Sequence, residues 1–140
     1  MTDVLTEVKI VLSVAGGFIT SVLGGCDTLL AVLLGFIVVD YLSGVAVALK
    51  QGKLSSRVGF LGILKKAMIL SVVFVAHLLD VATGFDAIRS MTVMFYISNE
   101  GISLVENMAM LDVKIPRKIR NILEQLEDEN EDTEDTQSDN

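Results

Sequence analysis

The sequence predicts an all-α fold: a small multi-span helical membrane protein with three membrane-crossing helices and an N-terminal helix that is either amphipathic or a fourth span. Hydrophobic residues make up 51% of the 140 residues, a high share for a soluble domain of this size. Long apolar segments recur along the chain, and basic residues gather between them. Both features are typical of small multi-span membrane proteins.

Residues 1–27 are expected to form the N-terminal helix and a turn. Within Val4–Leu23, small polar residues recur close to every 3.6 positions, which places a narrow polar stripe on an otherwise apolar helix. The helix is just long enough to span a membrane, and it could equally lie in the interface with Lys9 on the wet side. We expect Cys26 to be a small apolar residue in a tight turn with Gly24 and Gly25.

Residues 28–111 form the predicted transmembrane core, which is organised around Thr28–Leu49. A helix of this length reaches about 33 Å, enough to cross a hydrocarbon core of about 30 Å. The segment carries Asp40 near its middle. A charged group there costs about 2.5–3.5 kcal/mol, and each Leu, Ile or Val returns about 0.3–0.6 kcal/mol. The helix can therefore insert with Asp40 in place.

Two further spans are predicted at Ala67–Gly84 and Ile88–Leu111, joined by a short outside loop. Before the first of them, Ser55 or Ser56 could cap a short amphipathic helix that runs to Lys66. The basic loop Lys50–Lys66 and the segment after Leu111 hold the basic residues expected to set the topology: Lys50, Lys53, Arg57, Lys65, Lys66, Lys114, Arg117, Lys118 and Arg120. Because cytoplasmic loops are enriched in Lys and Arg, this pattern predicts that both segments and the C-terminus are cytoplasmic.

The C-terminal part divides into two predicted regions. Residues 112–126 are expected to contain a basic amphipathic helix with an apolar face. Residues 127–140 are expected to form a disordered acidic tail, because they offer too few apolar side chains to fold. This end explains the net charge of −7, since Glu124–Asn140 contains nine acidic residues and no basic one.

Polar residues in the predicted spans are the candidate functional residues. In the last span they recur at helical spacing and are expected to share one face: Tyr96, Asn99, Glu100, Ser103, Glu106 and Asn107. Asp40 and Glu100 each lie 12 residues from the outer end of their helices, so they should lie at one level. His77 should lie further out, and Ser43 follows Asp40 by about one turn. Glu106 and Asn107 should lie within reach of Lys65 and Lys66.

Two interpretations of these polar groups stay open. They could pair within the bundle, with Asp40 and Glu100 sharing a proton or one of them staying protonated. They could also line a water-filled opening in an oligomer, because lipid cannot satisfy polar groups. Both interpretations hold if the polar groups are buried between helices in one state and contact water in another.

Enzymatic, metal-binding and nucleic-acid-binding functions are not indicated. The glycine pairs lack the context of a phosphate-binding loop. One cysteine and one histidine cannot form a tetrahedral zinc site or a catalytic assembly. Anionic lipid at the inner membrane face accounts for the basic residues. We therefore expect no enzyme activity, cofactor, metal or nucleic-acid partner.

An ordered set of short motifs resembles a known family. The set comprises Asp40–Gly44 (DYLSG), Lys53–Ser56 (KLSS), Gly62 through Lys65 and Lys66, His77–Asp80 (HLLD), Tyr96–Asn107 (YISNEGISLVEN) and Ile115-Pro116. Together they resemble the phage-lysis and toxin-secretion holins of Gram-positive bacteria and their phages. The resemblance covers roughly Gly24 to Leu126. Cys26 stands where similar sequences are expected to have Trp.

The resemblance implies a function. Such a holin would accumulate in the host cytoplasmic membrane as a multi-pass protein, form homo-oligomers in the lipid bilayer, and make lesions at a set time. The lesions would release or activate a functionally coupled endolysin, or a toxin. Two alternatives stay open: an antiholin or regulator with the same fold, and a small transporter in which Asp40 or Glu100 exchanges protons.

Overall fold

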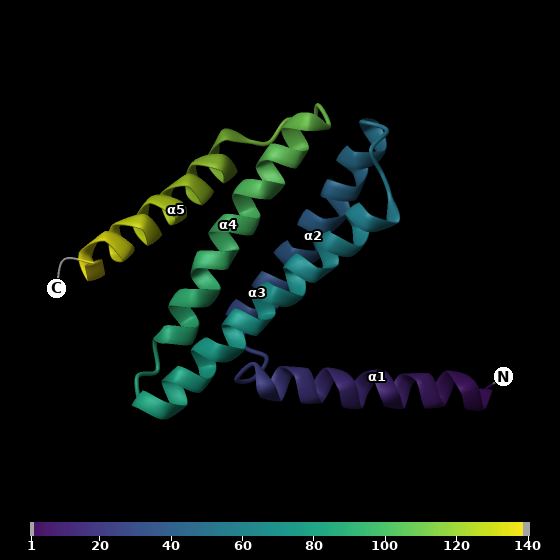
Figure 1. The fold of residues 1–140 in the computed structure, drawn as a ribbon, viewed down its shortest axis with the longest axis vertical. Coiled ribbons are helices and arrows are strands. Elements are labelled where there is room, and N and C mark those ends of the chain that lie inside the picture. Colours follow the sequence, from purple (N-terminus) through teal and green to yellow (C-terminus); the bar gives the residue numbers. More distant parts are fainter. Residues whose placement is uncertain (1, 139–140) are drawn as a thin grey trace.

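A computed structural model describes residues 2–138, and the side chains of residues 3–129. The described chain contains five helices and no strand: α1 (Thr2–Val22), α2 (Thr28–Lys50), α3 (Ser56–Thr83), α4 (Ile88–Met110) and α5 (Arg117–Ser138). Figure 1 shows α2, α3 and α4 running side by side, with α1 leading away from them and α5 folding back beside α4. The predicted all-α fold is confirmed.

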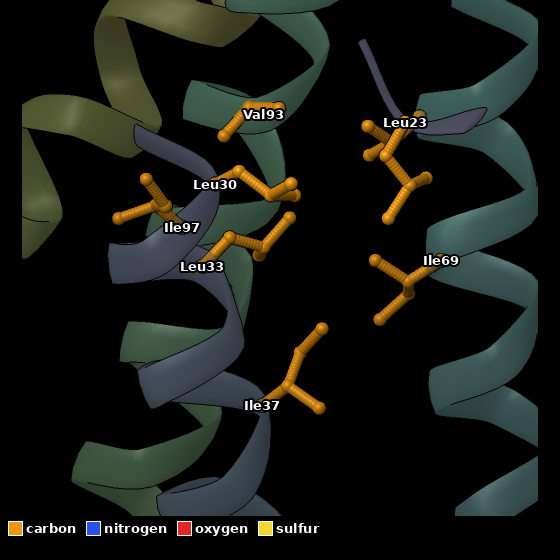
Figure 2. Packing of buried hydrophobic residues seen from close by; sticks show 8 residues of the cluster. Leu23, Leu30, Leu33, Ile37, Ile69, Val93 and Ile97 are labelled. Atoms are coloured by element: carbon orange, nitrogen blue, oxygen red, sulfur yellow. The ribbon is translucent and has the colours of Figure 1, made fainter. Parts of the chain in front are cut away.

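Helices α2, α3 and α4 form a bundle in which α4 packs along both of the others. The buried positions of α2 recur three or four residues apart, so one side of this helix faces its neighbours. Figure 2 shows apolar side chains of these helices, together with Leu23, meeting in the core. The core comprises Leu23, Leu30, Leu33, Ile37, Ile69, Val73, Val93 and Ile97.

Helix α3 joins the expected short helix before Lys66 and the span predicted from Ala67 into one continuous helix. The Ser55 side chain accepts a hydrogen bond from the Val58 N–H and caps the helix, which then runs unbroken to Thr83. The basic loop therefore ends at Ser55, and the prediction that Lys65 and Lys66 belong to it is wrong. The misplacement has a simple cause, since the adjacent lysines interrupt an apolar pattern that the helix continues through.

Three described helices are long and apolar enough to cross a membrane: α1, α2 and α3. The sequence instead predicts the segment of α4 as one of three spans and leaves open whether α1 crosses the membrane. The polar residues of α4 lower its mean hydropathy, although α4 has the same length as α2 and packs along it. Helix α1 is exposed along nearly its whole length and diverges from the bundle in Figure 1.

Helix α5 begins at Arg117, directly after Pro116, and continues to Ser138. The expected disordered tail from residue 127 is therefore helical as far as Ser138, and residues 139–140 lie outside the described part of the chain. The predicted apolar face is only partly used. Leu123 is buried, whereas Ile119 and Ile122 are about half exposed.

Candidate functional site

A cluster of charged side chains lies inside the bundle, and we call it the Lys66 cluster. It consists of Lys66 from α3, Asp40 and Ser43 from α2, and Glu100 and Asn107 from α4. Lys66 Nζ donates a hydrogen bond to Asp40 Oδ2 at 2.5 Å and another to the Glu100 carboxylate. The side chains of Lys66, Asp40 and Glu100 are 12%, 8% and 3% exposed. One ammonium group therefore joins all three helices.

The neutral members complete the hydrogen bonding of the Lys66 cluster. Asn107 Nδ2 donates to Asp40 Oδ1 at 3.1 Å and to Ser43 Oγ at 3.0 Å. Ser43 Oγ in turn donates to the backbone carbonyl of Asp40 at 2.9 Å. Among the described residues, no buried side-chain nitrogen or oxygen lacks a hydrogen-bond partner. Such satisfaction is what allows charges to be buried without a large net penalty.

The structure brings together part of the predicted polar set. Asp40 and Glu100 meet at one level, as their positions predicted, but they meet through Lys66. Of the expected neighbours Glu106, Asn107, Lys65 and Lys66, the structure brings together Asn107 and Lys66, which donate to the two oxygens of the Asp40 carboxylate. Glu106 and Lys65 are exposed and lie outside the Lys66 cluster.

The predicted polar positions of α4 fall within an arc of about 120°, but the bundle buries only one edge of that arc. Successive helix positions are rotated by about 100°, so neighbours such as Asn99 and Glu100 face different directions. Glu100 is buried against Lys66, whereas Asn99 and Glu106 are exposed and Ser103 is partly exposed. Asn99, Ser103 and Glu106 have no side-chain hydrogen bond or ion pair to any described residue. We call these three residues the outward stripe.

The other predicted site residues lie away from the Lys66 cluster. Tyr96 packs at the edge of the core and makes an edge-to-face contact with Phe95, with ring centroids 5.2 Å apart. His77 is partly buried and lies beside Gly24, at the turn between α1 and α2. The structure therefore divides the candidate residues between the cluster, the outward stripe and the packing of the bundle.

A second set of buried polar contacts lies where α1 meets α2, and we call it the Arg89 clamp. Arg89 is 7% exposed. Its Nε donates to the Leu23 carbonyl at 2.5 Å, Nη2 donates to the Gly25 carbonyl at 3.0 Å, and Nη1 donates to Asp27 Oδ2 at 2.8 Å. The guanidinium group of α4 thus holds the turn that sets the direction of α1.

Carboxylates cap the helices on either side of this clamp. Asp27 Oδ1 accepts a hydrogen bond from the Leu30 N–H at the start of α2. Asp80 of α3 accepts from the N–H groups of Ile88 and Arg89, each at 2.9 Å, at the start of α4. Since the first N–H groups of a helix have no partner within it, these carboxylates stabilise both helix starts.

The pKa of Asp27 is expected to be lowered because Arg89 and then the Leu30 N–H donate hydrogen bonds to its carboxylate. A lowered folded-state pKa stabilises the turn at pH values above the usual value of about 3.9, and this contribution is lost as the pH falls through the lowered pKa. Carboxyl NMR titration should therefore give a lower pKa for Asp27 in the wild type than in Arg89→Gln. Equal values in the two proteins would contradict the clamp.

Gly24 and Gly25 provide a matched test of the turn. Both have positive φ, 86° and 97°, so alanine at either position should cost about 1–2 kcal/mol. A Cβ at Gly24 would also lie 2.7 Å from His77 Nδ1 and 2.9 Å from Arg89 Nε, whereas Gly25 has open space. Gly24→Ala should therefore lower the free energy of unfolding by about 1–3 kcal/mol more than Gly25→Ala, as measured by denaturant titration in detergent. A smaller loss for Gly24→Ala would contradict the close approach.

The remaining basic residues that were assigned to topology are exposed. Lys50 Nζ at the end of α2 contacts Asp112 Oδ2 at 2.6 Å and the Met110 carbonyl at 2.8 Å, which joins the ends of α2 and α4. This contact lowers the pKa of Asp112. Lys53, Arg57, Lys65, Lys114, Arg117, Lys118 and Arg120 are exposed.

Sequence reasoning missed the roles of Lys66, Arg89 and Asp80. Lys66 was expected only to set the topology, and no role was predicted for Arg89. Their buried roles could have been predicted, because a charged residue inside a long apolar helix usually has a buried partner. Among the described residues, no three His, Cys, Asp or Glu side chains gather in a way that could hold a metal ion.

The fold and the site define an all-helical membrane protein whose bundle is joined by buried ion pairs. The model of the bacteriophage holin family matches residues 17–128, most of the chain. The chain therefore belongs to the bacteriophage holin family, as the motifs predicted.

Several relatives are similar over most of their length. An uncharacterized 14.9 kDa protein of Clostridium perfringens is 41% identical over 90% of this chain and 97% of its own length. A probable holin of Bacillus phage phi105 is 37% identical over 67% of this chain and 70% of its own length. An uncharacterized protein of Listeria monocytogenes is 41% identical over 71% of this chain and 72% of its own. No solved structure matches the chain.

Proposed function

We propose that the chain is a holin that oligomerises in a bacterial cytoplasmic membrane and forms lesions through which an endolysin, or a toxin, reaches the cell wall. Family membership supports a holin-type role. The observation that carries the proposal is the outward stripe of α4. Asn99, Ser103 and Glu106 lie on a helix of the bundle, point away from it, and have no partner among the described residues.

The two sides of the bundle suit different surroundings. The outward faces of α2 and α3 are apolar and exposed at many positions, including Val38, Val39, Leu42, Ile63, Leu64, Met68, Val72 and Val75. Lipid satisfies such faces, but it cannot satisfy the amide and carboxyl groups of the outward stripe. Several copies arranged with α2 and α3 toward lipid and α4 toward a shared centre would give the stripe water or another copy.

The Lys66 cluster supports a defined unit for such an assembly. It binds α2, α3 and α4 to one another through groups that are costly to separate in an apolar environment. A bundle held in this way can associate without unfolding. The cluster also weakens the transporter alternative, because Lys66 occupies both carboxylates that would have to exchange protons.

We propose a multi-pass topology with the loop between α2 and α3, and the C-terminus, in the cytoplasm. Lys50, Lys53 and Arg57 lie at one end of the bundle, and Lys114 and Arg117 follow the end of α4. Lys50 contacts Asp112, so both basic groups lie at the same end. A basic end of this kind is retained in the cytoplasm. Helix α1 would lie in the membrane as well, either in the interface or across it, because its exposed surface is apolar.

The stripe is tested by making it apolar. The variant Asn99→Leu/Glu106→Leu should still integrate into the membrane, since α4 becomes more apolar. Lysis should be delayed at least several-fold or abolished. The measurements are the membrane potential, from a potential-sensitive dye, and culture turbidity after induction. Val38→Leu/Val39→Leu places the same number of leucines on the apolar side and should leave the timing unchanged.

Wild-type timing in the Asn99→Leu/Glu106→Leu variant would count against a role of the stripe in lesion formation. An antiholin with the same fold would behave differently from the start. Expressed alone, it would leave the membrane potential intact, and expressed with a holin it would delay lysis. A paired expression experiment therefore separates these two functions.

A further inference from the structure

Helix α5 packs on α4, and Leu123 is the buried side chain of α5 at this contact. The buried Leu123 lies against Gly101, where an added Cβ would come 2.5 Å from Leu123 Cδ2 and 3.2 Å from Phe36 Cε1. The absence of a side chain at Gly101 therefore lets α5 approach α4 closely, and Phe36 of α2 lies on the other side of this contact. We call the contact of Leu123 with Gly101 and Phe36 the seat. Figure 1 shows α5 folding back from the end of α4.

The seat lies far from the end of α4, at about the level of the Lys66 cluster. Gly101 is nine positions from Met110 at the end of α4, or about 14 Å along the helix. It is also adjacent to Glu100 of the Lys66 cluster. If α4 crosses a hydrocarbon core of about 30 Å, Leu123 is therefore near its middle.

The residues around Leu123 are unsuited to lipid. Arg120 and Glu124 are exposed within one turn of Leu123, and Asp128 is exposed in the next turns. A charged side chain near the centre of a bilayer costs about 2.5–3.5 kcal/mol. Burial of Leu123 contributes about 1.5–3 kcal/mol, which offsets about one such charge and not all of them. Helix α5 can rest on this seat only where this side of α4 faces water.

We propose that α5 docks at Gly101 only when this side of α4 faces the water-filled opening of an oligomer, and that it forms part of the wall of that opening. This inference rests on the proposed function. When lipid covers the same side of α4, α5 is released and stays at the cytoplasmic surface. Docking of α5 and contact of lipid with Gly101 exclude each other.

The residues on the three sides of α4 support this proposal. Its first side, with Glu100 and Asn107, faces the bundle. Its second side carries the outward stripe, and its third side, at Gly101, is covered by the charged helix α5. At the level of the Lys66 cluster, both sides that point away from the bundle thus carry polar groups, one through its own side chains and the other through α5. A wall facing water would have this composition.

Disulfide crosslinking in cells tests the proposal. In a Cys26→Ser background, Gly101→Cys and Leu123→Cys place two thiols at the seat, and the smaller residue at 123 leaves room for the new side chain. An oxidant is added at intervals after induction, while a dye reports the membrane potential. An intramolecular disulfide is read as a reductant-sensitive change in electrophoretic mobility. Met91→Cys/Leu123→Cys is the control, because Met91 is exposed ten positions earlier on α4.

The crosslinked fraction of the Gly101→Cys/Leu123→Cys protein should rise at least several-fold when the membrane depolarises, while the control pair stays unlinked throughout. Equal crosslinking before and after depolarisation would overturn the inference, and so would its absence afterwards. Cells that never depolarise would instead contradict the proposed function. Crosslinking in such intact cells would separately overturn the inference.

Discussion

Lys66→Met should lower the free energy of unfolding by about 3–5 kcal/mol, because it leaves two buried carboxylates without their shared ammonium group. Asp40 and Glu100 are 8% and 3% exposed, so water can replace little of the lost interaction. The methionine side chain has nearly the length of lysine and keeps the packing of α3. Denaturant titration of the purified protein in detergent, followed by circular dichroism, measures the loss.

Two variants separate the ion pairs from packing and from charge in general. Lys65→Met removes an exposed lysine next in the chain and should change the free energy of unfolding by less than about 0.5 kcal/mol. The triple variant Lys66→Met/Asp40→Asn/Glu100→Gln removes all three charges and should recover most of the loss, because no buried charge stays unpaired. If Lys66→Met and Lys65→Met unfolded at the same denaturant concentration, the Lys66 cluster would not hold the bundle together.

Arg89→Gln should have the next largest effect, a loss of about 3 kcal/mol. The substitution removes the donors to the carbonyls of Leu23 and Gly25 and the partner of Asp27. It should also release α1, because the clamp is what holds the turn before α2. Amide hydrogen exchange should therefore accelerate in the turn between α1 and α2 more than in the α2–α4 bundle.

Two substitutions control for the charge and the shape of Arg89. Arg57→Gln removes an exposed arginine at the start of α3 and should leave both stability and exchange unchanged. Arg89→Lys keeps the charge but offers one nitrogen in place of the guanidinium fork, so it should restore little of the loss. Full recovery in Arg89→Lys would show that the charge alone holds the turn.

The helices themselves were largely predictable. The apolar run of Thr28–Leu49 differs from α2 by a single residue, and the predicted span Ile88–Leu111 differs from α4 by one residue at its end. Apolar length and breaking residues decide such boundaries locally, and Gly84 and Pro116 mark two of them. The Ser55 cap of α3 was predictable in the same way, but the continuation of this helix into the next span was not, because Lys65 and Lys66 resemble the end of a basic loop.

The partners of the polar residues could be predicted only in part. Counting residues along two helices was enough to place Asp40 and Glu100 at one level. Counting says nothing of rotation about each helix axis, so it could not show that Glu100 points inward while Asn99 and Glu106 point outward. It also could not show that α3 passes close enough for Lys66 to reach both carboxylates.

The sequence alone determined that this protein is a helical membrane protein of the holin type, because apolar length, basic flanks and the order of short motifs are properties of the chain itself. Only the tertiary structure decided that Lys66 joins three helices, that Arg89 holds the turn of α1, and that Leu123 rests on Gly101. Those contacts depend on how helices far apart in the sequence are rotated and packed against one another. No local pattern encodes that geometry.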